Sequence, residues 1–205
     1  YPTVLEVWGL SGSSPAQDRH RGFMEVLNSR IKVKEIFGKW KPETVEKEIA
    51  EMDSLEEVDV VFAHNDVMAM AARRAIERMH PGLADRICFV GIDAVSGRGS
   101  GLEAVMHGEL AASVLYPTGG SLAIRVAMQI LNGEDVSRQY LLSSALIDKN
   151  NAGTLFIQSE QVVDYQHQIE LQRENLESML SKYTFLQNSV GIILLLMGML
   201  LLSAL

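Results

Sequence analysis

The chain has 205 residues with a formal net charge of −8 at neutral pH, and it contains a single cysteine. This length allows one domain and an appendage. The negative charge and the lack of a Lys/Arg-rich run argue against nucleic acid as a partner. A single cysteine excludes an internal disulfide, and we expect Cys88 to be a buried structural thiol because it lies in an apolar run.

Short apolar runs of strand composition alternate with helical patterns over most of the chain. The expected strands cover residues 3–10, 31–37, 58–63, 86–92 and 111–115, and a last apolar run covers residues 140–147. Expected helices begin at Pro15 and just after the third strand, and others cover residues 42–52, 101–107 and 117–131. In the first helix, Phe23, Val26 and Leu27 are expected on the buried side. The alternation predicts an α/β fold with a doubly wound parallel sheet and helices on both faces.

Polar side chains follow several of these strands. The strand at 58–63 ends in a polar cluster that contains Asn65 and Asp66, either of which suits the N-cap of the helix that begins there. Asp93 and Tyr116 stand at the carboxyl ends of two later strands. Ligands of open α/β sheets bind at this edge, so the polar residues form a candidate binding site.

Several segments resemble the motifs of type I periplasmic sugar-binding proteins and the related lactose-repressor-type effector domains. The segments are residues 13–23, with their R-x-x-G-F ending, and residues 38–40, 62–69, 90–93 and 112–117. The resemblance covers about residues 3 to 150. It implies that the chain forms the second lobe of a two-lobed clamp for a sugar. We expect the first lobe to precede Tyr1, and residues 146–151 resemble the segment that returns across the hinge.

The resemblance also implies a role for each of five residues. Arg19 would donate to sugar hydroxyls or the ring oxygen, and Trp40 would stack on the sugar face. Asn65 would hydrogen-bond a hydroxyl, and Asp93 would accept from hydroxyls. Tyr116 stands where the family often has Gln, a departure that leaves the identity of the sugar open. The residue types suit a sugar independently, because Arg donates, Asp accepts and an aromatic face covers the C–H groups of the ring.

Each of these residues also has a purely structural interpretation. Asn65 would cap a helix and Asp93 a turn, Trp40 would pack on a neighbouring lysine, and Arg19 would pair with Asp18 or Glu25. We favour the binding roles because the polar residues recur at the same end of several strands.

Beyond residue 157 the chain changes character. Residues 158–187 predict a helical stalk, in which Val162, Ile169, Leu176 and Tyr183 repeat every seventh position. This spacing indicates a coiled coil, and the alternative is a single amphipathic helix lying on the lobe. Residues 188–205 are apolar and uncharged, which predicts a transmembrane helix. We expect this helix to be truncated at the last residue of the sequence. We therefore interpret the chain as a piece of a longer protein, with residues 1–157 as its lobe and hinge return.

This combination resembles the sensor region of bacterial hybrid two-component histidine kinases. The resemblance implies a small-molecule sugar as ligand and an inner-membrane location with residues 1–187 on the periplasmic side. The seven-residue repeat of the stalk leads us to expect a homodimer formed through it. We expect no enzyme activity in this segment, since the kinase domain lies outside the sequence and no catalytic constellation is present.

Two alternatives stay open at this point. The first is a membrane-tethered binding protein that feeds a transporter. The second is a nucleotide-dependent enzyme that uses the glycine-rich loop at 97–101, although this loop lacks the G-x-G-x-x-G order. The histidines show no paired metal-ligand spacing. The sequence therefore predicts neither a cofactor nor a metal site.

Overall fold

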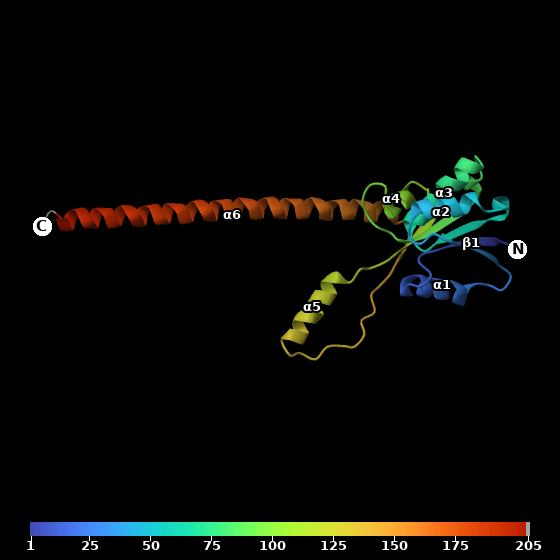
Figure 1. The fold of residues 1–205 in the computed structure, drawn as a ribbon, viewed down its shortest axis with the longest axis horizontal. Coiled ribbons are helices and arrows are strands. Elements are labelled where there is room, and N and C mark those ends of the chain that lie inside the picture. Colours follow the sequence, from blue (N-terminus) through green and yellow to red (C-terminus); the bar gives the residue numbers. More distant parts are fainter. Residues whose placement is uncertain (204–205) are drawn as a thin grey trace. The chain divides into compact units, whose positions relative to one another are not determined.

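The computed structural model describes residues 1–203. Its contacts divide the chain into two units, Tyr1–Ser159 and Glu160–Leu205. The first unit is built on a six-stranded sheet in the order β2-β1-β3-β4-β5-β6 (Figure 1). The strands are β1 Thr3–Trp8, β2 Lys32–Phe37, β3 Val60–Ala63, β4 Cys88–Asp93, β5 Ala112–Leu115 and β6 Leu146–Asp148.

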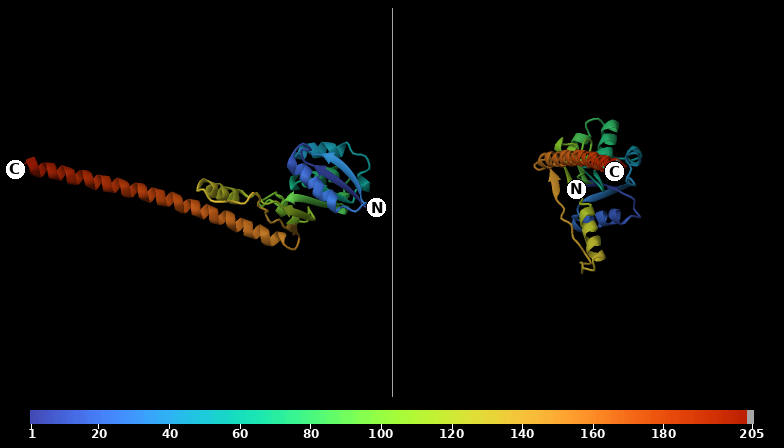
Figure 2. Two further views of the ribbon diagram at one scale, coloured as in Figure 1. Left: turned by 90° about the horizontal axis from the view of Figure 1, so that it is seen from below. Right: turned by 90° about the vertical axis from the view of Figure 1, so that its left-hand side faces the viewer.

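Helices lie on both faces of this sheet, as the sequence predicts. The helices of the first unit are α1 Ser14–Val26, α2 Pro42–Ala50, α3 Asp66–Met79, α4 Gly101–Met106 and α5 Gly120–Leu131, with short 3-10 turns at Leu55–Glu57 and Ala84–Arg86. Helix α1 lies on one face of the sheet, while α2, α3 and α4 lie on the other (Figure 1, Figure 2). The predicted α/β fold is thereby confirmed.

The sheet is mixed, whereas the sequence predicted a parallel one. Strands β1 to β5 pair in parallel, but β6 runs antiparallel to β5, with Ser113 opposite Ile147. The chain leaves the sheet at the carboxyl end of β5, forms α5, and comes back to that same edge. A strand that re-enters from the edge where its neighbour ended must run in the opposite direction.

The two faces of the sheet are buried to different extents. Helix α3 buries eight of its residues, including Met68 and Ile76, and these pack with α2 against the sheet. Helix α1 buries only Ala16. Phe23 of α1 is partly buried and stacks on Phe62 of β3 with ring centroids 4.8 Å apart. The prediction that Val26 is buried is wrong, because the side of α1 that faces the sheet carries Ala16, His20 and Phe23.

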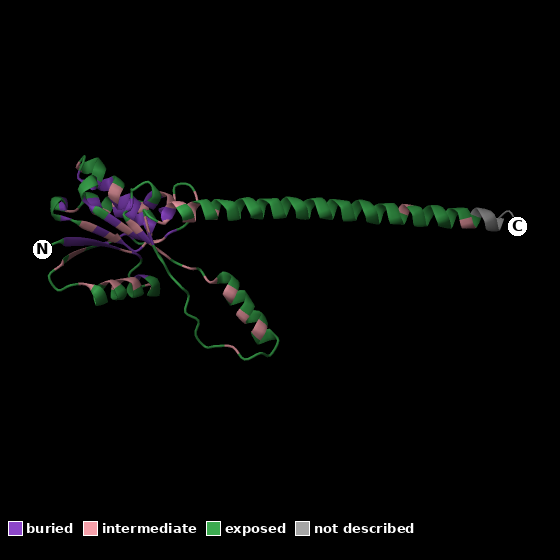
Figure 3. Ribbon diagram, turned by 180° about the vertical axis from the view of Figure 1, so that it is seen from behind, coloured by how far each residue is buried: buried purple, intermediate pink, exposed green. Residues whose placement is uncertain are grey.

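Helix α5 of the first unit lies outside the hydrophobic core. Helix α5 carries no buried residue, and Figure 3 shows it without the purple that marks buried positions. Its apolar side chains Ile124 and Leu131 are exposed.

Cys88, predicted to be buried, is also exposed. It opens β4, where successive side chains point to opposite faces of the sheet, and its neighbour Phe89 takes the buried side.

Helix α6 spans Ala152–Ser203 without interruption. It is the one helix in the described part of the chain that is long and apolar enough, by length and composition, to cross a membrane. The predicted stalk at 158–187 is helical throughout, and so is the predicted transmembrane segment from 188 to 203. Residues 204 and 205 of that predicted segment lie outside the described residues.

Candidate functional site

Arg19 connects one face of the sheet to the carboxyl ends of its central strands. It projects from α1, and its side chain is 13% exposed. Its Nη1 donates to the backbone oxygen of His64, directly after β3, at 2.7 Å. Its Nη2 donates to Asp93 Oδ1, at the end of β4, at 3.2 Å. The alternative that Arg19 pairs with Asp18 does not hold, because Arg21 takes that carboxylate.

Two aromatic rings flank the same guanidinium. The Arg19 Cζ atom lies 5.3 Å from the centroid of Trp40 and 5.1 Å from the centroid of Tyr116. Cation–π contacts at this distance favour a fixed position for the charge. Four of the five residues that the sequence selected, namely Arg19, Trp40, Asp93 and Tyr116, therefore meet at one point.

Asn65 lies beside this group and also caps a helix. Its Oδ1 accepts from the backbone N–H of Met68 at 2.9 Å, which is the N-cap geometry of α3. This decides between the two cap candidates in favour of Asn65. Because the cap uses only the side-chain oxygen, the amide NH2 can still donate to a ligand.

The backbone of the candidate site is strained at two of the selected residues. Trp40 has φ 66° and Asp93 has φ 119°, a region that non-glycine residues rarely adopt. The indole of Trp40 lies against Gly9, where an added Cβ would be only 2.2 Å from the ring. Strain of this kind persists only where the surroundings hold it, and it concentrates at ligand sites.

A buried pair of side chains lies next to Arg19 and Trp40, and the sequence did not reveal it. Arg19 donates to the backbone oxygen of one member, His64, and the Trp40 ring lies near the His64 ring. His64 and Glu6 are both fully buried. His64 Nδ1 accepts from the backbone N–H of Gly9 at 3.1 Å, so the ring proton is on Nε2 and donates to Glu6 Oε1 at 2.9 Å. The one sequence signal for this pair was an acidic residue inside the apolar strand Val4–Val7.

Asp66, directly after the cap, is a further buried residue, for which the sequence offered only a role as a helix cap. It is 2% exposed. Its Oδ1 accepts from the hydroxyl of Ser113 at 2.6 Å, and its Oδ2 accepts from the N–H of Ala94 at 2.7 Å. Burial raises the pKa of Asp66 to about 6, although these two hydrogen bonds favour the charged form. Burial also raises the pKa of Asp93, against the opposing charge of Arg19.

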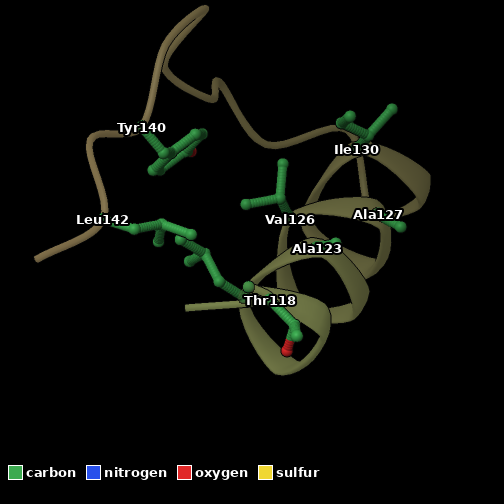
Figure 4. Close-up of a pocket in the computed structure, with 9 residues that line it drawn as sticks. Thr118, Ala123, Val126, Ala127, Ile130, Tyr140 and Leu142 are labelled. Atoms are coloured by element: carbon green, nitrogen blue, oxygen red, sulfur yellow. The ribbon is translucent and has the colours of Figure 1, made fainter. Parts of the chain in front are cut away.

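A hollow of about 390 Å³ opens beside Arg19 and Tyr116, and its lining also includes Pro117 and Ser144. Trp40, Asn65 and Asp93 do not line it. A second cavity, of about 430 Å³, lies between α5 and the loop that carries Tyr140 and Leu142 (Figure 4). This second cavity is apolar and does not include any of the five selected residues. The hollow at Arg19 contains a charged donor, whereas the polar side chains of the cavity at α5 are the hydroxyls of Thr118 and Tyr140.

The described residues offer little support for a cofactor or metal site. In residues 1–203 one group of side chains, Glu6, His20 and Glu35, has ligand atoms close enough to share a metal ion. These atoms already have partners, since the Trp8 Nε1–H donates to Glu35 and His64 donates to Glu6. In the glycine-rich loop, the Gly99 N–H is taken by Glu103, which removes a donor that a nucleotide phosphate would need.

Comparison with known proteins assigns the fold to a family. A family model described as "Periplasmic binding protein domain" matches residues 3–135. The chain belongs to this periplasmic binding protein family. It is 32% identical over 153 residues to the ribose import binding protein RbsB of Salmonella typhimurium, a match that covers 71% of this chain and 49% of that protein. The RbsB protein of Escherichia coli K12 is 31% identical with the same coverage.

Solved structures of this family give the same result. The fructose-binding periplasmic domain of a hybrid two-component system superposes with a TM-score of 0.77 at 32% identity, covering 82% of this chain and 57% of that one. A Mycobacterium smegmatis protein in complex with β-D-fucofuranose superposes with a TM-score of 0.68 at 26% identity, covering 80% and 55%. This periplasmic binding protein domain therefore spans about half the length of the relatives it matches.

Proposed function

We propose that this chain is the ligand-sensing part of a membrane-bound hybrid two-component histidine kinase that binds a sugar in the periplasm. The observation that carries the proposal is the meeting of Arg19, Trp40, Asp93 and Tyr116 at the carboxyl edge of the sheet. A guanidinium, a carboxylate and two aromatic faces are the groups that a neutral sugar requires. The likeness to a fructose-binding sensor domain of a hybrid two-component system supports the signalling role.

In this proposal residues 1–157 form one lobe of a two-lobed clamp. Arg19 has five N–H donors and uses two of them on protein oxygens, which leaves others for a sugar oxygen. Helix α5 supports a second lobe, because its apolar residues Ile124, Met128 and Leu131 are exposed. Apolar surface of this extent on one helix calls for a partner. A second lobe would cover it and close over the sugar.

Signalling in this proposal passes through α6. We infer a homodimer in which the stalk at 158–187 pairs as a coiled coil and residues 188–205 cross the inner membrane, with residues 1–187 in the periplasm. The support is a single helix that runs from Ala152 to Ser203 and carries an exposed stripe at Val162, Ile169, Leu176 and Tyr183. A continuous helix can carry a rotation or a shift from lobe to membrane.

One alternative function has an observation in its favour. The curated relatives of this chain are ribose import binding proteins, which suggests a tethered binding protein that delivers sugar to a transporter. The two functions differ in what sugar binding changes. Sugar-dependent autophosphorylation of the full-length protein supports the sensor, and sugar uptake that depends on this protein without phosphorylation supports the transporter.

The direct test of the sugar site is calorimetry on the intact protein with a panel of monosaccharides that includes ribose and fructose. We expect at least one to bind, and Asp93→Ala to weaken it by about 10- to 100-fold, because Arg19 and the sugar hydroxyl both lose their acceptor. Asp53→Ala, at an exposed position, is the matched control and should bind as the natural protein does. Unchanged affinity in Asp93→Ala contradicts the assignment of the site.

Trp40 gives a second and independent test. If its ring stacks on the sugar, Trp40→Ala should weaken sugar binding by about tenfold and Trp40→Phe should recover most of the loss, because an aromatic face remains. The same calorimetry measures both variants, and thermal unfolding shows whether they fold. A melting temperature that falls while the affinity of the folded protein stays constant would mean that Trp40 only packs against Gly9. Trp8→Phe, at an indole that donates to Glu35, is the control.

A further inference from the structure

Asp66 occupies a place that the structure has shaped for a carboxylate. It is the first residue of α3, but its side chain turns away from the helix end and into the sheet. Two glycines leave room for it. A Cβ added at Gly91 would lie 2.1 Å from Asp66 Oδ1, and one added at Gly101 would lie 1.9 Å from Oδ2. No larger residue at either position would leave space for the Asp66 side chain as it stands.

The hydrogen bond from Ala94 to Asp66 holds an unfavourable turn at the end of β4. Asp93 and Ala94 have φ values of 119° and 46°, so two consecutive residues with side chains lie in the left-handed half of the map. Such residues cost about 1–3 kcal/mol each and persist only when neighbouring contacts fix them. The Ala94 N–H is bound by Asp66 Oδ2 at 2.7 Å and by Ser113 Oγ at 3.1 Å. This turn aims the Asp93 side chain at Arg19.

We propose that Asp66, as a carboxylate, is a positioning residue for the sugar site: it fixes the turn at Asp93 and Ala94 and so makes sugar affinity depend on pH. The proposal rests on the proposed sugar-binding function. Asp66 is buried and acts through Asp93, without contact to the sugar.

The charge state of Asp66 sets the direction of this pH dependence. Burial raises its pKa to about 6; among the charged groups that face it, Asp93 raises the pKa and Arg19 lowers it. Above pH 6 the carboxylate accepts strongly from Ala94. Below pH 6 it is protonated and becomes a weaker acceptor, because charge-assisted hydrogen bonds are about twice as strong as neutral ones. Sugar affinity should therefore fall as the pH drops through about 6.

The contribution of Asp66 to folding has the opposite sign, which separates loss of binding from unfolding. A carboxyl whose pKa is higher in the folded protein than in the unfolded chain binds more protons when folded. Its contribution to stability is therefore largest in acid and is lost as the pH rises from about 4 to about 6. At acid pH, protonation of Asp66 should therefore weaken sugar binding without lowering the free energy of unfolding of the lobe.

The experiment is calorimetry on the intact, detergent-solubilised protein between pH 5 and pH 7.5, with the sugar that binds the natural protein most tightly. We expect the Kd of the natural protein to rise by about tenfold on going to pH 5, the loss expected when a charged hydrogen bond becomes neutral. Asp66→Asn is the neutral isostere. At pH 7.5 it should bind about as weakly as the natural protein does at pH 5, and its affinity should vary much less with pH.

Ser113→Ala is the second variant, and it tests the same idea in a different way. The Ser113 hydroxyl stabilises the charged form of Asp66, so its removal should move the midpoint of the pH dependence to higher pH. Thermal unfolding checks that both variants fold. If Asp66→Asn fails to fold, the pH dependence of Ser113→Ala still tests the proposal. A pH dependence that is unchanged in both variants overturns the proposal. Absence of sugar binding by the natural protein at every pH overturns the proposed function as well.

Discussion

Replacing Arg19 with alanine should reduce sugar affinity by at least about 100-fold, the largest effect that we expect from any single residue of the site. The change removes the two hydrogen bonds to His64 O and Asp93 Oδ1 and leaves a half-buried carboxylate without its cation. It also removes the group that lies between the rings of Trp40 and Tyr116. Calorimetry on the intact protein measures the loss.

Arg19→Lys should recover only a small part of this affinity. A lysine ammonium is a point charge, whereas the guanidinium reaches two protein oxygens in one plane and still presents further N–H groups to a ligand. The matched control is Arg21→Ala on the same helix, where the arginine is exposed and pairs with Asp18. If Arg19→Ala and Arg21→Ala bind sugar equally well, Arg19 is a structural residue that only joins α1 to the sheet.

Much of the fold could be predicted from the sequence because the strands are short apolar runs separated by helices with clear ends. The carboxyl ends of β3, β4 and β5 then had to lie along one edge, which is why Asn65, Asp93 and Tyr116 could be grouped without a structure. Arg19 lies on a helix, so the resemblance to a known family was needed to select it. Trp40 follows a predicted strand, and the resemblance supplied its role.

The supporting residues could not be predicted, because long-range hydrogen bonds leave no periodic trace in a sequence. Glu6 and His64 are 58 positions apart and Asp66 and Ser113 are 47 apart, yet each pair is buried and bonded. Asp66 in particular had an equally good local interpretation as a helix cap. Only the structure shows that Asn65 caps α3 and that Asp66 turns inward to Ala94.

The errors in the prediction have a common physical cause. The antiparallel pairing of β6 and the exposure of α5 both arise where the chain leaves the sheet after β5 and returns to it. Local patterns predict that a helix follows a strand but not what the helix packs against. The prediction for Cys88 was wrong for a similar reason, because an apolar run does not show which of its alternating side chains point to the exposed face of the sheet.

The second large effect concerns the pairing of α6. If two stalks pair through the stripe at Val162, Ile169, Leu176 and Tyr183, a cysteine at position 176 should cross-link between protomers at least about tenfold faster than one at 177 or 178. In such a pair the seam would bring Leu176 close to its counterpart. Glu177 instead lies on the side where it pairs with Arg173 along the same helix.

The experiment requires the protein in a bilayer and a background without Cys88, because that thiol is exposed and would form disulfides of its own. Cys88→Ser supplies the background, and Leu176→Cys, Glu177→Cys and Ser178→Cys are compared in it under mild oxidation. The membrane matters because an isolated helix with an imperfect seam is marginal in water, whereas two anchored helices meet at high local concentration. Added sugar should change the rate at 176 if lobe closure rotates or shifts the pair. Equal rates at all three positions would mean that the stripe is not an interface, and the signal would then have to cross the membrane without a paired stalk.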